Sequence, residues 1–157
     1  MTKNDKIKSA IRKVITNEQE DTLLNHLKTW WKGNGDFNGI ITETGFKVWR
    51  CHWFWTGVGY PVVIGEISEA NNRVQINLKT KINKAGMIFM LFLLFLWIIL
   101  LLIILIGGTN LNTLFSKIIV SFLYLVIFGY PFVAGYRINR EKIFYEIEEI
   151  IKATNNN

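Results

Sequence analysis

Two long apolar stretches in the second half of the chain dominate its hydrophobic pattern. Residues 87–106 contain no charged residue, no amide side chain, no Gly and no Pro. At about 1.5 Å of rise per residue, a helix of this length matches the ~30 Å hydrocarbon core of a bilayer. Residues 114–136 predict a second span, kinked where Pro131 cannot donate a hydrogen bond to the carbonyl of Ile127. Neither span contains a GxxxG motif, so the sequence marks no helix-packing face.

Between residues 37 and 80 apolar and polar positions alternate, which is the two-residue period of a half-buried strand. The pattern predicts four strands, at about residues 37–42, 46–51, 62–68 and 73–80. Short polar turns after the first and third of these favour antiparallel hairpins. We therefore predict a four-stranded antiparallel meander whose last strand runs into the first span.

Apolar residues at helical spacing predict three amphipathic helices outside the spans. Residues 4–16 form a short basic helix, which suits an anionic lipid surface, with a frayed and solvated end as the alternative. The second helix begins at Asn17 as N-cap, with Glu20 completing a capping box. Its apolar face comprises Leu23, Leu24, Leu27, Trp30 and Trp31. The third helix, at 138–153, carries a stripe of isoleucines and returns to the side of the sheet.

Together these elements predict an α+β membrane protein. A two-helix transmembrane hairpin is attached to a small four-stranded antiparallel sheet, which packs with amphipathic N- and C-terminal helices. The predicted segments are a basic amphipathic segment (1–16), a cytoplasmic helix plus sheet (17–84), the first span (87–106), a short loop (107–113), the second span (114–136) and the C-terminal helix (138–153).

The loop at residues 52–61 is rich in aromatic side chains. Antiparallel pairing brings it to the sheet end from which the first span leaves, so it faces the bilayer. Trp and Tyr favour the membrane interface because their rings are amphipathic. The predicted membrane-interface residues are Trp30, Trp31, Trp53, Phe54, Trp55 and Tyr60. The alternative is that these rings fill the small core between the sheet and the helices.

Charge adds an orientation to this arrangement. The formal net charge of +6 comes from residues outside the spans and indicates a positive-inside bias, not nucleic-acid binding. Basic residues flank the domain side of both spans, against Lys117 alone at the loop end, so both termini are predicted to be cytoplasmic, in a bacterial inner membrane. The topology-setting residues are Lys79, Lys81, Lys84, Arg137, Arg140 and Lys142. The candidate lipid-headgroup residues are Lys3, Lys6, Lys8, Arg12 and Lys13.

Residues with catalytic or metal-binding chemistry are few. Cys51 and His52 are a nucleophile and a base, but neighbours in a strand point to opposite faces, so they do not form a dyad unless the loop turns between them. The second histidine, His26, lacks metal-ligand spacing to any Asp, Glu or Cys. A single cysteine excludes an internal disulfide. The spans contain no acidic residue, which disfavours a carrier or proton channel. We therefore expect no enzyme activity, no cofactor and no metal.

The order of parts resembles a known group of proteins. The segments Phe37-x-Gly39-x-Ile41, Phe46-x-Val48-x-Arg50, Pro61-x-Val63-x-Gly65-x-Ile67 and Arg73-x-x-Ile76-x-Leu78 precede the hairpin and the terminal helix. This arrangement resembles small uncharacterised bacterial membrane proteins of the YcxB-like group, over roughly residues 18–153. The resemblance implies a pleckstrin-homology-like sheet joined to a membrane hairpin, and it implies no catalytic residues.

Three functions fit these predictions. The first is a non-enzymatic, membrane-anchored interaction module or accessory subunit of a membrane complex, whose partners are lipids and another membrane protein or a second copy. The second is a membrane-disrupting effector of a bacterial defence type, whose soluble domain senses a signal. The third is an anionic-lipid-binding domain on a membrane anchor, which would use the basic N-terminal segment and the aromatic loop.

Overall fold

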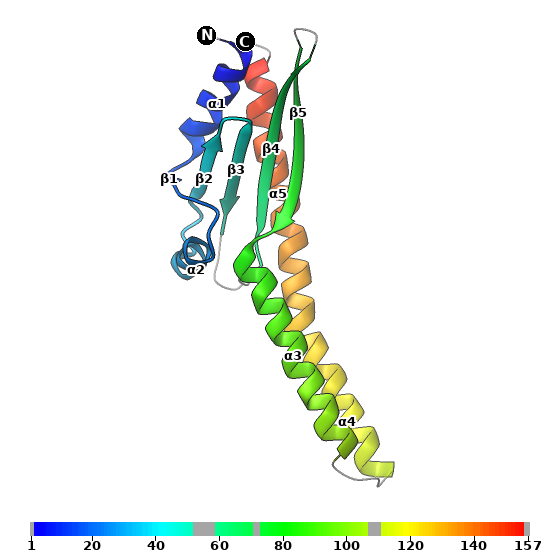
Figure 1. The fold of residues 1–157 in the computed structure, drawn as a ribbon. Coiled ribbons are helices and arrows are strands. Elements are labelled where there is room, and N and C mark those ends of the chain that lie inside the picture. The colour runs from blue at the N-terminus through cyan, green and yellow to red at the C-terminus, as the bar shows by residue number, and fades with distance from the viewer. Residues whose placement is uncertain (1, 52–58, 71–72, 107–110, 156–157) are drawn as a thin grey trace.

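The computed structural model describes residues 2–51, 59–70, 73–106 and 111–155. Figure 1 shows a narrow sheet with helices along it, from one end of which a long helical hairpin projects, while both termini lie at the other end. In chain order the elements are α1 (Lys3–Val14), β1 (Asn17–Glu18), α2 (Leu23–Lys32), β2 (Phe37–Thr42), β3 (Gly45–Arg50), β4 (Pro61–Ala70), β5 (Arg73–Ile82), α3 (Lys84–Ile106), α4 (Leu111–Tyr124), the π turn η2 (Leu125–Gly129) and α5 (Tyr130–Asn155).

The sheet has five strands in the order β1-β2-β3-β4-β5, not the four that were predicted. The four predicted strands are present as the antiparallel meander β2 to β5, and β1 adds a short parallel edge beside β2. The amides of Thr16 and Gln19 flank β1 and donate to the carbonyls of Phe37 and Gly39 at 2.8 Å. A strand of two residues is too short to produce an alternating pattern, so periodicity could not reveal it.

The predicted capping box at Asn17 and Glu20 is wrong, because Asn17 belongs to β1. The second helix begins after Thr22, whose hydroxyl accepts from the amide of Asn25 at 3.3 Å. It ends at Gly33, which has the left-handed φ of 52° that favours glycine. The predicted cap failed because pairing with β2 holds residues 17–18 extended.

The main core lies between one face of the sheet and the helices α1 and α5. Ile7 and Ile11 of α1 are fully buried, as is Ile147 of α5. The full set of buried residues in this core is Ile7, Ile11, Phe46, Val48, Val63, Ile143, Ile147 and Ile151. The apolar stripe of the N-terminal helix therefore packs on protein, and the C-terminal helix covers the sheet as predicted.

Arg50 joins the sheet to α5. Its guanidinium donates to Oε1 of Glu146 at 2.8 Å and lies 4.4 Å from the centre of the Phe37 ring. The Arg50 side chain is 10% exposed and that of Glu146 is 34% exposed, so this ion pair is only partly shielded from screening by water and salt. The contact fixes the upper half of α5 against the end of β3.

The hairpin consists of α3 and of one continuous helix formed by α4, η2 and α5. Both helices are long and apolar enough to cross a membrane. Only 6% of the most apolar stretch is buried in the first and 18% in the second. The core helix of a water-soluble protein would be mostly buried, so the exposed apolar surface of these helices favours lipid.

The second helix departs from α geometry next to Pro131, where a kink was predicted. The departure takes the form of the π turn η2, which ends two residues before this proline. Proline lacks the amide proton that would continue the α-helical ladder, and π turns are one way in which a helix adjusts to an interrupted ladder. Across the hairpin, Nε1 of Trp97 donates to the hydroxyl of Ser121 at 3.0 Å.

Candidate functional site

The helix α2 lies at the end of the sheet from which α3 leaves (Figure 1). Apart from Trp30, which is partly buried, its apolar side chains are exposed. Leu24 is 60% exposed, Leu27 is 41% exposed and Trp31 is 76% exposed. The residues of α2 that are buried are polar, namely His26 and Thr29. Amphipathic surface helices normally bury the apolar stripe, so the orientation of α2 is inverted for a protein surrounded by water.

A buried chain of hydrogen bonds holds α2 in this orientation. Nε2 of His26 lies 2.8 Å from Oδ1 of Asp21, and Nδ1 lies 2.9 Å from the hydroxyl of Tyr60. The Tyr60 hydroxyl also donates to the carbonyl of His26 at 3.0 Å. The imidazole packs on Trp49, with 4.8 Å between the ring centres. Because His26 and Tyr60 are fully buried, these bonds satisfy the imidazole that α2 turns inward.

Three lysines converge on Asp21. Nζ of Lys81 lies 2.9 Å and Nζ of Lys47 lies 3.2 Å from Oδ2, while Nζ of Lys84 donates to the Asp21 carbonyl at 2.7 Å. Burial opposes ionisation of this carboxyl, but hydrogen bonds from His26, Lys81 and Lys47 outweigh it and hold the Asp21 pKa well below its usual range. Asp21 is therefore a carboxylate that joins the start of α2 to β3, β5 and the start of α3.

Burial also sets the protonation of the other two groups. Burial lowers the pKa of His26, since the cost of an enclosed imidazolium outweighs the attraction of Asp21. Burial raises the pKa of the Tyr60 phenol. The imidazole is consequently neutral near pH 7. Its Nε2 donates to the Asp21 carboxylate, and its Nδ1 and the His26 carbonyl both accept from the Tyr60 hydroxyl, whose single proton they share.

An Asp-His-Tyr chain is a possible proton relay, but this one is enclosed. None of the three side chains lines the polar pocket beside α2 or the apolar groove between the hairpin helices. The three side chains instead connect the start of α2 to the residue before β4.

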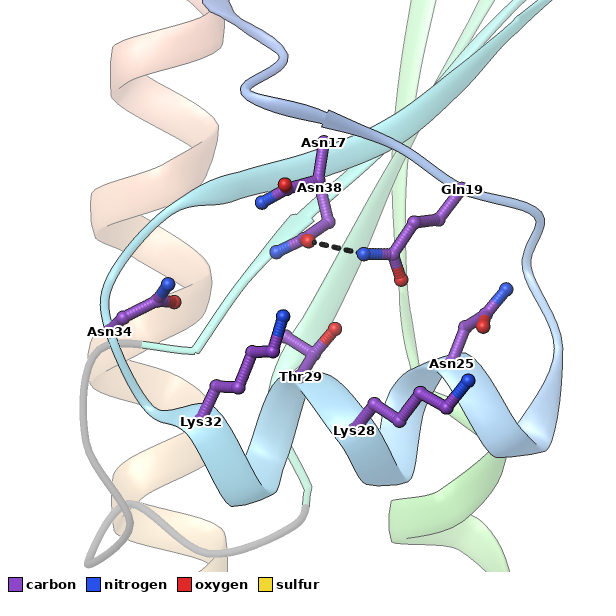
Figure 2. Close-up of a pocket in the computed structure, with 8 residues that line it drawn as sticks. All are labelled: Asn17, Gln19, Asn25, Lys28, Thr29, Lys32, Asn34 and Asn38. Atoms are coloured by element: carbon purple, nitrogen blue, oxygen red, sulfur yellow. Dashed lines mark hydrogen bonds between the residues drawn. The ribbon is translucent and has the colours of Figure 1, made fainter.

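The polar pocket, of about 310 Å³, lies between α2 and the strands β1 and β2 (Figure 2). Its lining residues are Asn17, Gln19, Asn25, Lys28, Thr29, Lys32, Asn34 and Asn38. The apolar groove, of about 310 Å³, lies lower down, between α3 and the helix that contains the π turn. Its lining residues are Ile82, Met87, Met90, Leu91, Leu93, Leu94, Tyr124, Phe128, Gly129, Phe132 and Val133.

The predicted interface residues fall into three groups. Trp31 is exposed on α2, whereas Trp30 is partly buried against Trp49 and Phe132. Tyr60 is fully buried, so its ring contacts protein and the prediction that it contacts lipid is corrected: the hydroxyl is used by His26. The remaining three, Trp53, Phe54 and Trp55, lie outside the described residues.

The predicted headgroup residues lie on α1, at the end of the sheet opposite the hairpin (Figure 1). The exposed members are Lys3, Lys6, Arg12 and Lys13. The fifth, Lys8, is half-buried and donates to the carbonyl of Glu43. A bilayer around the hairpin would therefore not reach the basic residues of α1.

The six topology-setting residues lie where the chain passes between the sheet and the hairpin. On the descending side, Lys79 pairs with Glu66 at 3.0 Å, and both Lys81 and Lys84 contact Asp21. On the returning side, the three predicted residues lie on α5 and are exposed: Arg137, Arg140 and Lys142. Three of the six thus also have structural partners.

Other reactive groups do not assemble into a site in the described part of the chain. Within it, no group of three or more His, Cys, Asp or Glu side chains could hold a metal ion. Cys51 is buried, and His52 lies outside the described residues, so the geometry of that pair is not defined.

The sequence analysis did not identify Asp21 and His26 as a buried pair. Two polar residues at His26 and Thr29, three apart and flanked by apolar ones, were the available signal that the polar side of α2 faces inward.

Comparison of the chain with known proteins adds no family. Searches against family models, curated proteins and solved structures returned no match. The likeness to the YcxB-like group therefore stays an expectation from the sequence. The function has to be inferred from α2, its supporting network, the pocket and the groove.

Proposed function

We propose that the chain is an integral membrane protein in which α3 and the helix from α4 to α5 cross the bilayer, with both termini in the cytoplasm. The low burial of both apolar helices supports this topology. So does the charge balance, because six basic residues flank the domain side and only Lys117 lies near the opposite end. The bacterial inner membrane is the proposed location.

In this topology α2 is an interfacial helix. Its exposed side chains Leu24, Leu27 and Trp31 enter the boundary between headgroups and acyl chains, beside the start of α3. Lys28 and Lys32 are exposed on the same helix and extend to the headgroups. The hairpin and α2 then hold the sheet against one leaflet, so the inverted orientation of α2 has a physical cause.

The function we propose is that of a non-enzymatic, membrane-anchored interaction module, an accessory subunit of a membrane protein complex. The observation that carries it is the apolar groove at the π turn. Gly129 lines this groove, and a Cβ added there would meet no atom within 4 Å. Small residues allow transmembrane helices to approach closely, and π turns are frequent at functional sites.

The proposed occupant is a transmembrane helix of the partner protein. The groove extends along α3 from Met87 to Leu94, which is about two helical turns and suits a crossing helix. Phe128 and Phe132 line the other side, and Phe128, which is 50% exposed, offers a large apolar surface there. The opening beside Gly129 gives room for a side chain of the incoming helix.

The test is Gly129→Leu in the full-length protein, extracted with a gentle detergent at native abundance. A Cβ at this position meets no atom within 4 Å, so the backbone accepts a larger residue here, and the leucine side chain narrows the groove that Gly129 lines. We expect a fixed set of membrane proteins to co-purify with the wild type and to be lost at least tenfold from the variant. The control is Val120→Leu, at an exposed position that does not line the groove.

Three results would contradict the proposal. Partners retained by Gly129→Leu would mean that the groove is not the contact. Only lipid recovered from the wild type would mean that the groove holds an acyl chain. Depolarisation of cells on induced expression, with no co-purifying protein, would support the membrane-disrupting effector in place of the subunit.

A further inference from the structure

The polar pocket beneath the sheet edge has a charge pattern that the groove does not share. Two of its lining residues are lysines and none is an aspartate or glutamate. Lys28 and Lys32 are four residues apart on α2 and therefore lie on one side of the helix. Neither makes an ion pair with an acidic side chain in the described part of the chain. The pocket consequently presents two ammonium groups without a counter-charge.

The opposite wall consists of amides whose orientation is set by their own hydrogen bonds. Nε2 of Gln19 donates to Oδ1 of Asn38 at 3.0 Å, and Nδ2 of Asn38 donates to the carbonyl of Asp36 at 2.9 Å. This order leaves Oε1 of Gln19 directed toward α2 (Figure 2). That oxygen is buried and has no hydrogen-bond partner among the described residues. A buried acceptor without a donor is costly, so a ligand that supplies one would be favoured.

These features restrict the ligand. The absence of a lining carboxylate, together with the two lysines, disfavours a metal ion. No aromatic side chain lines the pocket, so it offers no surface on which a nucleobase could stack. Lysine ammonium groups are point charges that bind phosphate oxygens well. Two buried oxygens of lining residues, Oε1 of Gln19 and Oγ1 of Thr29, have no hydrogen-bond partner among the described residues, which favours a ligand that also carries a hydroxyl group.

We propose that this pocket binds a small phosphate ester that carries a hydroxyl group. Lys28 and Lys32 contact the phosphate oxygens, and Oε1 of Gln19 accepts from the hydroxyl. The pocket volume of about 310 Å³ holds a glycerol phosphate group. The same chemistry is found in an anionic lipid headgroup and in a free polyol phosphate. The site is distinct from the groove, so this inference and the proposed function can fail separately.

The test measures binding of sn-glycerol 3-phosphate and inorganic phosphate to the full-length protein in a neutral detergent, by ligand-observed NMR. We expect glycerol phosphate to bind more tightly than inorganic phosphate, which has no polyol hydroxyl. The Lys28→Gln/Lys32→Gln variant should lose at least tenfold in affinity for both, and Gln19→Ala should remove the difference between them. The control is Lys3→Gln/Lys6→Gln on α1, which changes the net charge equally at exposed positions remote from the pocket.

A second arm distinguishes the two sources of the phosphate. The protein is placed in nanodiscs of phosphatidylcholine with or without phosphatidylglycerol, and the retained lipids are counted by native mass spectrometry. Phosphatidylglycerol selected by the wild type and lost in the double lysine variant assigns the pocket to a lipid headgroup. Binding of soluble glycerol phosphate without lipid selection assigns it to a free ester. The proposal is overturned if neither probe binds, or if the α1 control loses binding as strongly as the pocket variant.

Discussion

At the scale of single residues, the least expected feature is the buried group formed by Asp21, His26 and Tyr60. Each side chain forms a hydrogen bond with another member of the group. Removing one would leave a buried polar atom without a partner, which lowers the free energy of unfolding by about 1–3 kcal/mol. Such groups are specified by contacts between residues far apart in the sequence. His26 and Tyr60, for example, come from different elements and meet only in the folded chain.

The protonation of His26 can be measured directly. His52→Gln leaves His26 as the single histidine, and its titration can be followed by ¹⁵N NMR. We expect a midpoint below the usual value of about 6.5, because burial disfavours the imidazolium, with the neutral ring protonated at Nε2. The unfolded chain takes up this proton near pH 6.5 and the folded chain only at lower pH. The free energy of unfolding should therefore fall as the pH drops below about 6.5.

The control for this titration is His26→Gln in the same background, where that part of the pH dependence should vanish. A midpoint at or above about 6.5 would contradict the prediction, because it would mean that the attraction of Asp21 outweighs the cost of burial.

A second prediction at the residue scale concerns the loss of stability when one of two glycines is replaced by alanine. A Cβ at Gly45 would lie 1.9 Å from the carbonyl oxygen of Gly65, and backbone in the middle of a sheet cannot move away. Gly45→Ala should lower the free energy of unfolding by about 1–3 kcal/mol, measured by thermal unfolding in detergent. Gly129→Ala is the matched control, since it meets no atom within 4 Å. Equal stability of the two variants would show that the strands can separate locally.

At the scale of elements, α2 is the helix whose setting depends most on its surroundings. Its apolar residues were predicted from their spacing, and so was the proximity of Trp31 to the interface. Its polar residues face the sheet, because Asp21 and Tyr60 satisfy His26 there. Burying the apolar side in their place would expose this network and remove its partners. The outward orientation of the apolar side of α2 is thus coupled to the polar interior.

The depth of α2 can be tested with spin labels in a Cys51→Ala background. A nitroxide at Leu24→Cys should collide more with oxygen, which concentrates in lipid, than with a water-soluble nickel complex. The label at Glu43→Cys, in the exposed turn between β2 and β3 at the other end of the sheet, serves as the control and should show the reverse. If both labels behave as water-exposed in nanodiscs, α2 does not dock on the bilayer.

At the scale of the whole molecule, the helical hairpin projects from one end of the α/β domain, and both ends of the chain lie at the other end of that domain (Figure 1). The register of β4 and β5 pairs Pro61 with Ile82, so the start of one strand and the end of the other both meet α3. Residues remote in sequence, such as Ile7 and Ile147, then close the core between α1 and α5.

The proposed topology predicts which positions are accessible from each side of the membrane. In the Cys51→Ala background, Ser9→Cys and Ala153→Cys should be labelled by an impermeant thiol reagent only from the cytoplasmic side. Thr113→Cys, in the first turn of α4, should be labelled only from the opposite side. Labelling of positions 9 and 153 from different sides, or a protein that stays dispersed without detergent, would refute the two-span topology.

The sequence by itself determined the elements with a local cause. The two long helices follow from their largely apolar composition, β2 to β5 follow from alternation, and the helix over the sheet follows from its isoleucine stripe. The tertiary structure alone decided the edge strand β1, the inward side of α2, the burial of Tyr60, the polar pocket and the groove at Gly129. Each of these depends on contacts between distant segments, and a local period carries no information about which segments will meet.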